Sequence, residues 1–187
     1  MVWWVREARP TKAMNILSAR RYPNQRNGPL SLQQAETRRL AYAIKDPASP
    51  VRDFDAAARE MAALIQTPCW LVPIPNSAGS TRANSILASI IATHCPGAQL
   101  AQALRRTRRI ESQCSRHRRD LPSTPVVEHH IAATGRQLGC RQIYLIDNVC
   151  TSGNTLRAAH QALGKGCGLV FAATGHGHAD GDTRTLL

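Results

Sequence analysis

Long hydrophobic runs, lysine and aromatic residues are all scarce in this chain. No stretch of its 187 residues stays apolar over the roughly 20 residues that a membrane-spanning helix requires. Residues 1–7 do not combine a basic start with an apolar core, so they do not resemble a secretory signal. The sequence therefore predicts a cytoplasmic protein that makes no use of a membrane.

The cysteines and histidines of this chain do not occur at the sequence spacings of zinc-binding motifs. The chain has no Cys-x-x-Cys pair and no Cys/His cluster at zinc spacing. Scattered thiols of this kind are typical of a reducing compartment, where several serve as small core residues. His176 and His178 stand in a polar tail, where exposure is commoner than metal binding, so we predict no metal site built by the protein itself. The six cysteines are Cys69, Cys95, Cys114, Cys140, Cys150 and Cys167.

Acidic residues are in the minority, and the net charge is +12 at neutral pH. A charge of this size favours an anionic partner, either a polyanion or a ligand rich in phosphate. Arginines concentrate in residues 105–120, which show almost no apolar periodicity and are called the basic arm below. Three roles are open for this arm: a lid over a phosphorylated ligand, a nucleic-acid contact through residues 105–119, or a solvated surface.

Apolar periodicity predicts an α/β protein with a parallel twisted sheet flanked by helices and a helical N-terminal extension. Strands and helices should alternate in the core, at residues 69–75, 81–94, 99–104, 125–138, 143–146, 156–163 and 169–174. The helix at 125–138 should bury three apolar residues and expose two histidines: Val127, Ile131 and Leu138 inside, His129 and His130 outside.

The N-terminal third follows a different pattern. Residues 1–30 show no clear period and are expected to form an irregular arm. Ser31 and Gln34 form a capping box that should start a helix with Leu32, Leu40 and Ile44 as its apolar positions, and a second helix is expected at 53–66. We divide the chain into an extension that could recognise a base, a core and a loose tail: residues 1–66, 67–175 and 176–187.

The most specific feature of the chain is the stretch from Ile143 to Thr155, Ile-Tyr-Leu-Ile-Asp-Asn-Val-Cys-Thr-Ser-Gly-Asn-Thr. Four apolar residues run into Asp147 and Asn148, and a Thr/Ser/Gly turn precedes an apolar helix. A buried strand, a polar turn and a helix N-terminus together provide backbone N–H groups for a phosphate. The loop at 75–80 follows another strand, so both loops should share one edge of the sheet.

The stretch resembles the phosphoribosyl-pyrophosphate (PRPP) motif of type I phosphoribosyltransferases, in which four apolar residues, two acids and two apolar residues precede Thr-Thr/Ser-Gly-x-Thr. The resemblance implies that Asp147 and Asn148 are catalytic residues that bind the ribose hydroxyls. It also implies a 5′-phosphate site made by the turn, and Mg²⁺ held mainly by PRPP. The turn residues are Thr151, Ser152, Gly153, Asn154 and Thr155.

Two further segments resemble the ComF-like branch of this family, named for competence for DNA uptake. The Pro-Ile-Pro-Asn sequence at 73–76 is similar to the opening of its pyrophosphate loop, which assigns Asn76 and Ser77 to pyrophosphate. The basic arm is similar to its flexible loop, which assigns Arg105 and Arg109 to the same group. The resemblance covers residues from about 69 to 174, and its arm also includes Arg108, Gln113, Arg118 and Arg119.

The resemblance implies transfer of a phosphoribosyl group from Mg·PRPP to an acceptor, with release of pyrophosphate. Asn148 replaces the second acid and removes a negative charge near a carbocation-like transition state. Thr151 stands where purine-salvage members carry a carboxylate, which argues against a hypoxanthine–guanine site. A non-catalytic PRPP or nucleotide sensor, and an accessory protein of DNA uptake that contacts nucleic acid, therefore stay open. The sequence does not identify the acceptor of the phosphoribosyl group. A homodimer is one of the oligomeric states that stay open.

Overall fold

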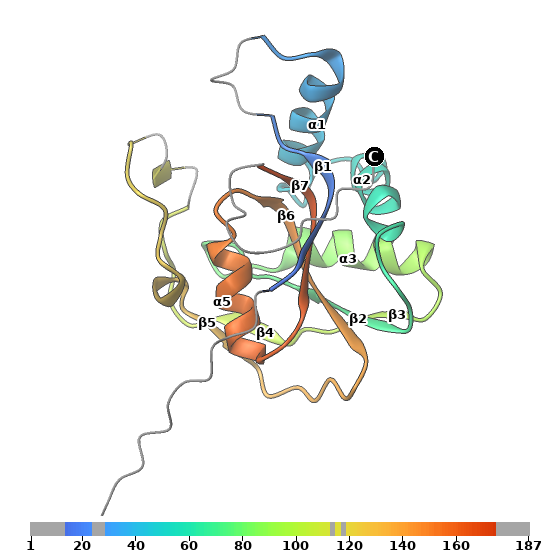
Figure 1. Ribbon diagram of the computed structural model, residues 1–187, viewed down its shortest axis with the longest axis vertical. Helices are drawn as coiled ribbons and strands as arrows, with labels where there is room; N and C mark the ends of the chain where they lie inside the picture. The colour runs from blue at the N-terminus through green and yellow to red at the C-terminus, as the bar shows by residue number, and fades with distance from the viewer. Residues whose placement is uncertain (1–13, 24–28, 113–114, 117–118, 175–187) are drawn as a thin grey trace, which may run out of the picture.

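The computed structural model describes residues 14–23, 29–112, 115–116 and 119–174. They form a five-stranded parallel sheet with helices on both faces, in the strand order β1-β7-β6-β2-β3 (Figure 1). The chain is therefore an α/β protein, as predicted. The strands are β1 (Ile16–Arg21), β2 (Cys69–Pro73), β3 (Ala98–Leu100), β6 (Gln142–Cys150) and β7 (Cys167–Ala173).

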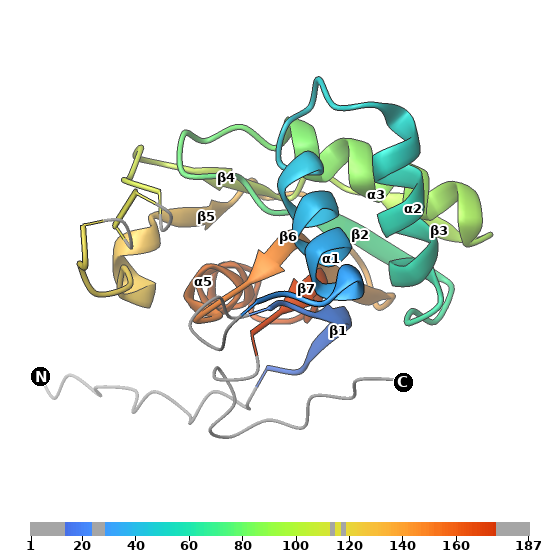
Figure 2. The same ribbon diagram turned by 90° about the horizontal axis from the view of Figure 1, so that it is seen from above.

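Helices cover the two faces of the sheet unequally. Helices α1, α2 and α3 pack on one face, and α5 packs on the other (Figure 2). Phe54 and Met61 of α2 and Leu87 of α3 are fully buried against Phe171 of β7 on the first face, whereas Leu156 of α5 is buried on the second. The helices are α1 (Leu32–Ala43), α2 (Val51–Ala62), α3 (Arg82–His94) and α5 (Asn154–Leu163).

Strand β6 is longer than the predicted strand at 143–146. Its first half pairs with β2 up to the Pro73–Ile146 register, and its second half pairs with β7 as far as Cys150. Strand β2 ends at Pro73, whereas β7 continues to pair with β6. Asp147 and Asn148 therefore lie on the strand itself, and the turn begins only at residue 151.

The prediction of an irregular arm at 1–30 was wrong for residues 16–21. These residues form β1, which pairs with β7 from Ile16–Gly168 to Arg21–Ala173 and so closes one side of the sheet. The sequence of β1, Ile-Leu-Ser-Ala-Arg-Arg, shows no regular alternation of apolar and polar residues. The strand is therefore defined by its pairing with β7 and not by a local sequence pattern. Helix α1 begins with the predicted capping box, but Leu32 is 92% exposed and not buried. Residues 1–13, the start of the expected arm, lie outside the described part.

The segment between β3 and β6 departs most from prediction. The expected strand at 99–104 is split into β3 and β4 (Leu104–Arg106), and β4 pairs with β5 (Ile131–Ala133) in a separate antiparallel sheet. The expected helix at 125–138 is only the 3₁₀ turn η2 (Val126–His129), because His130 adopts a left-handed φ of 50° that ends it. Val127 is consequently 82% exposed and His129 is 1% exposed, the reverse of the predicted faces.

The strand order places a topological switch point between β2 and β6. From β2 the chain passes through α3 to β3 on one side, and from β6 it passes through α5 to β7 on the other. Ligands of open α/β sheets bind outside the carboxyl ends of the strands at such a point. The described segments contain no helix with the length and apolar character needed to cross a membrane.

Candidate functional site

The carboxyl ends of β2 and β6 bring the two predicted loops together. The Ile74 N–H donates to the Ile146 carbonyl oxygen at 3.0 Å, immediately before Asp147. Loop 75–80 leaves β2 at this point, and the chain of β6 reaches the turn at 151–155 a few residues later. The polar segments that sequence reasoning assigned to one ligand therefore start from neighbouring strands at the switch point.

Asp147 is half-buried at this edge and receives two hydrogen bonds on the same oxygen. The Asn148 N–H donates to Oδ1 at 2.9 Å, and Asn84 Nδ2 donates to it at 3.3 Å. Burial raises the pKa of the Asp147 carboxyl, and these two donors and the charges of Lys45 and Arg106 oppose the rise. Asp147 is thus a carboxylate in a poorly hydrated position, surrounded by donors and cations from separate elements.

Asn148 and Cys150 complete the end of β6. Asn148 Oδ1 accepts a hydrogen bond from the Val149 N–H at 2.8 Å. This bond fixes the orientation of the Asn148 amide and therefore of its Nδ2 group. Cys150 is buried, as its apolar place in the pattern predicted, and burial raises the pKa of its thiol to about 11. A thiol with so high a pKa is a poor nucleophile at neutral pH, so Cys150 is a packing residue.

The turn before α5 has the backbone form of an anion site. Gly153 is the N-cap of α5 with a left-handed φ of 75°, which a glycine adopts without strain. Ser152 Oγ accepts from the Asn154 N–H at 3.5 Å, and Thr151 is exposed at the rim. Thr155 is half-buried in the first turn of the helix. The four N–H groups at a helix start have no partner within the helix and favour an anion.

Arg157 is a residue of this turn that sequence reasoning missed. Its Nη2 donates to the Ser152 carbonyl oxygen at 2.5 Å and to Asn154 Oδ1 at 2.9 Å. A Cβ atom at Gly153 would stand 3.3 Å from Arg157 Nη1, so the guanidinium lies directly against the turn. The sequence feature that could have indicated this contact is the spacing of Arg157, which follows Gly153 by one helical turn.

Loop 75–80 is held by the side chain of Asn76. Asn76 Oδ1 accepts from the N–H groups of Ala78 and Ser80, both at 3.0 Å, and Gly79 has a φ of 94°. Asn76, predicted to lie near the pyrophosphate, therefore uses its side-chain oxygen to shape the loop. The Ser77 carbonyl oxygen accepts from the Ile110 N–H at 3.0 Å, which joins this loop to the basic arm.

Arg106 is the second residue that sequence reasoning missed. Its guanidinium donates to three carbonyl oxygens: Asn76 at 2.7 Å, Pro75 at 3.2 Å, and His129. Burial lowers its pKa, and the negative charge of Asp147 opposes that effect. The predicted Arg105 lies next to it on β4 but is exposed. Adjacent residues of a strand face opposite ways, so only one of the two arginines points at loop 75–80.

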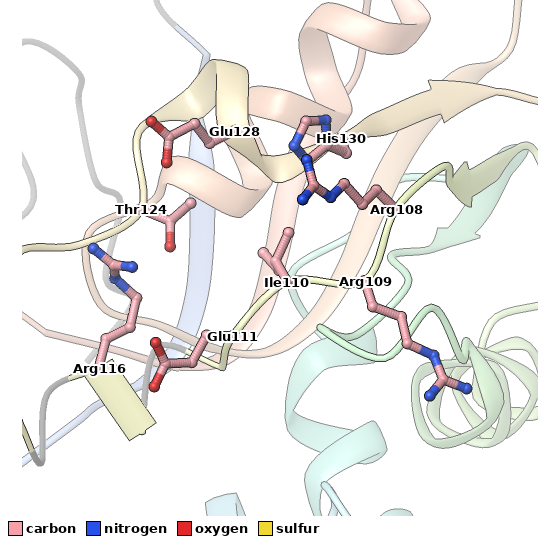
Figure 3. Close-up of a pocket in the computed structure, with 8 residues that line it drawn as sticks. All are labelled: Arg108, Arg109, Ile110, Glu111, Arg116, Thr124, Glu128 and His130. Atoms are coloured by element: carbon pink, nitrogen blue, oxygen red, sulfur yellow. The ribbon is translucent and has the colours of Figure 1, made fainter.

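The basic arm lines one side of an open pocket of about 330 Å³, and residues 124–130 line the other (Figure 3). In this view the side chains of Arg108 and His130 lie beside each other, whereas the predicted Arg109 extends away from them. Gln113 and Arg118, named with the arm above, lie outside the described residues. The pocket is lined by Arg108, Arg109, Ile110, Glu111, Arg116, Thr124, Glu128 and His130.

The pocket connects to both predicted phosphate loops. Asn154 Nδ2 in the first turn of α5 donates to the Thr124 carbonyl oxygen at 2.8 Å. Ile110, on another wall, is bonded to Ser77 as described above. The walls of the pocket are therefore attached to loop 75–80 through Ile110 of the arm and to the turn at 151–155 through Thr124, which follows the arm.

Metal ligands are sparse at this edge. No group of three or more His, Cys, Asp or Glu side chains among the described residues could hold a metal ion. The polar side chains present offer carboxylate and amide oxygens, which suit a hard cation that takes most of its ligands from phosphate and water. His176 and His178 lie outside the described residues.

The chain was also compared with known proteins. No protein-family model, no curated protein and no solved structure matches it.

Proposed function

We propose that this chain binds Mg·PRPP and transfers its phosphoribosyl group to an acceptor with release of pyrophosphate, as a type I phosphoribosyltransferase of the ComF-like branch. The observation that carries the proposal is the placement of the stretch at 143–155. Asp147 ends the buried part of β6 at the switch point, and the Thr/Ser/Gly turn follows at the start of α5. In this proposal the protein acts in nucleotide metabolism in the cytoplasm.

Each part of PRPP has a counterpart at this edge. The 5′-phosphate binds to the turn at 151–155, where helix N–H groups and Arg157 supply positive potential. Asp147 accepts hydrogen bonds from the ribose hydroxyls through Oδ2, which no donor among the described residues reaches, and Asn148 assists beside it. Most N–H groups of loop 75–80 bond within the loop, so this loop offers the pyrophosphate the backbone N–H and the hydroxyl of Ser77.

Cleavage of the C1–O bond places positive charge on the ribose and negative charge on the departing pyrophosphate. The Asp147 carboxylate stabilises the positive charge, and the nearby cations stabilise the negative charge. Arg106 is half-buried against loop 75–80 and is a better placed cation for the pyrophosphate than the exposed Arg105. Mg²⁺ travels with the substrate, whose oxygens are its main ligands, and it neutralises the leaving group.

The basic arm acts as a lid in this proposal. Ile110 of the arm is bonded to Ser77, Thr124 just after the arm is bonded to Asn154, and the pocket between them carries three arginines. A cover of this kind excludes water from a reactive ribosyl cation and so favours transfer over hydrolysis. The acceptor would enter from the side of the N-terminal extension, where Lys45 stands near Asp147.

Calorimetric titration of the protein with PRPP, with and without Mg²⁺, tests the proposal when pyrophosphate is assayed in the same samples. Magnesium-dependent binding with pyrophosphate release is the expected result. Asp147→Ala should abolish binding, whereas Asp55→Ala, which removes a carboxylate from the α2–α3 surface, should leave it unchanged. Retained affinity in Asp147→Ala would remove Asp147 from the site, and the absence of binding by the unaltered protein would overturn the proposal.

A PRPP or nucleotide sensor is the second candidate, and Asn148 is the observation that favours it. The amide keeps the hydrogen bond to Val149 but supplies no negative charge to a ribosyl cation. A sensor would bind Mg·PRPP in the titration and release no pyrophosphate with any acceptor. Release of pyrophosphate would exclude it.

A nucleic-acid accessory role is the third candidate, because Arg105, Arg108, Arg109 and Arg119 all lie exposed on the arm. A contact of this kind predicts affinity for single-stranded or duplex DNA that falls steeply as salt rises. The variant with Arg105, Arg108 and Arg109 changed to Gln should then lose most of the affinity. Removal of three arginines from other surfaces, at Arg38, Arg52 and Arg59, is the control of equal charge. An equal loss in both variants would indicate nonspecific attraction.

A further inference from the structure

We propose that Asn84 is a positioning residue that holds Asp147 as a carboxylate, in one orientation, at the carboxyl end of β6. Asn84 lies in the first turn of α3 and is 6% exposed. Its Nδ2 donates to the Ile74 carbonyl oxygen at 2.8 Å and to Asp147 Oδ1 at 3.3 Å. One buried amide thus joins the ends of β2 and β6 at the switch point. The role in PRPP binding rests on the function proposed above.

The bond to Ile74 fixes which way the amide faces. A carbonyl oxygen can only accept, so the group of Asn84 that contacts Ile74 must be the NH₂ group. The same NH₂ group then faces Asp147, and rotation of the amide would set two oxygens against each other at Ile74. A fixed donor of this kind bonds best to an ionised carboxylate. Asn84 therefore selects the ionised form of Asp147, in a place where burial favours the protonated form.

The other end of the amide supports a specific role. Asn84 Oδ1 is buried, and no donor in the described part of the chain reaches it. Buried polar atoms without partners are uncommon because they lose their hydration without compensation. An apolar residue at position 84 would avoid this loss, so the packing of α3 does not explain the asparagine. The two bonds made by Nδ2 do explain it.

The other charged groups around Asp147 are few and come from three elements. Lys45 follows α1 and Arg106 lies on β4, and both favour the ionised carboxylate. Cys150 on β6 has a thiol that stays neutral. Among the described residues, neither Lys45 nor Arg106 donates a hydrogen bond to Asp147. Asn84 is therefore the side chain that hydrogen-bonds to the Asp147 carboxylate and orients it.

Carbon-13 NMR titration of the Asp147 carboxyl, assigned with Asp147→Asn, tests this role without any ligand. Asn84→Leu keeps the number and branching of the side-chain heavy atoms and removes the donor, so the midpoint of Asp147 should move to higher pH. PRPP affinity at neutral pH should fall about tenfold and recover as the pH is raised, the size being that of a hydrogen bond to a charged group. Ser85→Ala, a neighbouring change on α3 that removes the bond from Gln102, should move neither quantity.

The outcomes separate this inference from the proposed function. An unmoved Asp147 midpoint in Asn84→Leu, or an affinity loss that is the same at every pH, overturns the role of Asn84. A moved midpoint in a protein that never binds PRPP upholds the role of Asn84 and overturns the proposed function. Should Asn84→Leu fail to fold, Asn84→Asp keeps the shape and replaces the donor by an acceptor; its Asp147 midpoint must rise, and an unchanged midpoint overturns the inference.

Discussion

Arg106 donates from Nε to the carbonyl oxygen of Asn76 at 2.7 Å, and this contact fixes the root of the basic arm to loop 75–80. The same guanidinium also donates to Pro75 and to His129, whose ring is buried. One side chain therefore joins the end of β2, strand β4 and the turn η2. The candidate site depends on this junction, because loop 75–80 and the basic arm meet there with η2, which packs against α5.

Replacement of Arg106 by Met should release the arm. The three carbonyl oxygens lose a charged donor, which costs about 1–3 kcal/mol of the free energy of unfolding. Trypsin should then cleave the arginines of the arm faster, and the denaturant midpoint should fall. Arg105→Met is the matched control, since it removes the exposed neighbour on the same strand. Equal effects of the two changes would contradict the junction described here.

Gly153→Ala should distort the turn before α5. At a φ of 75° an alanine is strained by about 1–2 kcal/mol, and its Cβ would lie 3.3 Å from Arg157 Nη1. Affinity for PRPP, or for inorganic phosphate at the same turn, should fall with the stability. Gly164→Ala at the other end of α5 has a φ of 70° and open space around it. It should lose similar stability by denaturant titration and keep its affinity for phosphate, and a loss of affinity in both variants would refute a local effect.

Asp147→Asn should stabilise the protein at neutral pH while it abolishes PRPP binding. Burial raises the pKa of Asp147 above its ordinary value of 3.8, so ionisation is less favourable in the folded chain than in the unfolded chain. The unaltered protein therefore loses stability as pH rises from that ordinary value through the raised one, and the variant does not. Thermal melting at a series of pH values should show equal Tm values in acid and a higher Tm for the variant at neutral pH.

Asp55→Asn should behave in the opposite way and serves as the control. The hydrogen bond to His94 is the largest cause that lowers the pKa of Asp55, ahead of the charges of Arg59 and His94. Its carboxylate therefore stabilises the fold above its ordinary pKa and ceases to do so as pH falls through the lowered value. The prediction for Asp147 would be contradicted by a Tm of Asp147→Asn below that of the unaltered protein at neutral pH. The negative charge of Asp147 would then not destabilise the folded state.

The elements that could be predicted are those with strong local patterns. The apolar run at 143–146 is central in the sheet and buried on both faces, so it contains its own evidence of a strand. The capping box of Ser31 and Gln34 starts α1 as expected. The neighbouring polar loops of β2 and β6 followed from parallel strand packing alone. In these cases, the residues that decide the structure are close together in the sequence.

The elements that were missed depend on distant partners. Strand β1 forms because β7 offers an edge about 150 residues later, as the Ile16–Gly168 pair shows. Strands β4 and β5 pair with each other although the basic arm separates them in the sequence. His130 ends η2 with a left-handed φ, which no feature of the local sequence predicts. The sequence alone could not distinguish Arg106 from Arg105, since the orientation of β4 decides which of the two side chains faces loop 75–80. Sequence located the arm but not its fold.

The last prediction concerns Asn148, the one position where the stretch at 143–155 departs from two acids. Asn148→Asp keeps the acceptor for the Val149 N–H and adds a negative charge beside Asp147. If a ribosyl cation forms there, a second charge at about 4 Å should stabilise it by roughly 1–4 kcal/mol, which corresponds to a rate increase of about fivefold to nearly 1,000-fold. Pyrophosphate release from Mg·PRPP, measured with and without acceptors, should therefore rise.

Two controls separate charge from shape at this position. Asn148→Ala removes the side-chain acceptor and the charge together, and it should weaken PRPP binding without raising turnover. Asn154→Asp adds the same charge at the turn for the 5′-phosphate, where it repels the ligand and should lower affinity. A rate that is unchanged in Asn148→Asp while PRPP still binds would mean that charge at position 148 does not limit catalysis, and the sensor would then be the better account of the site.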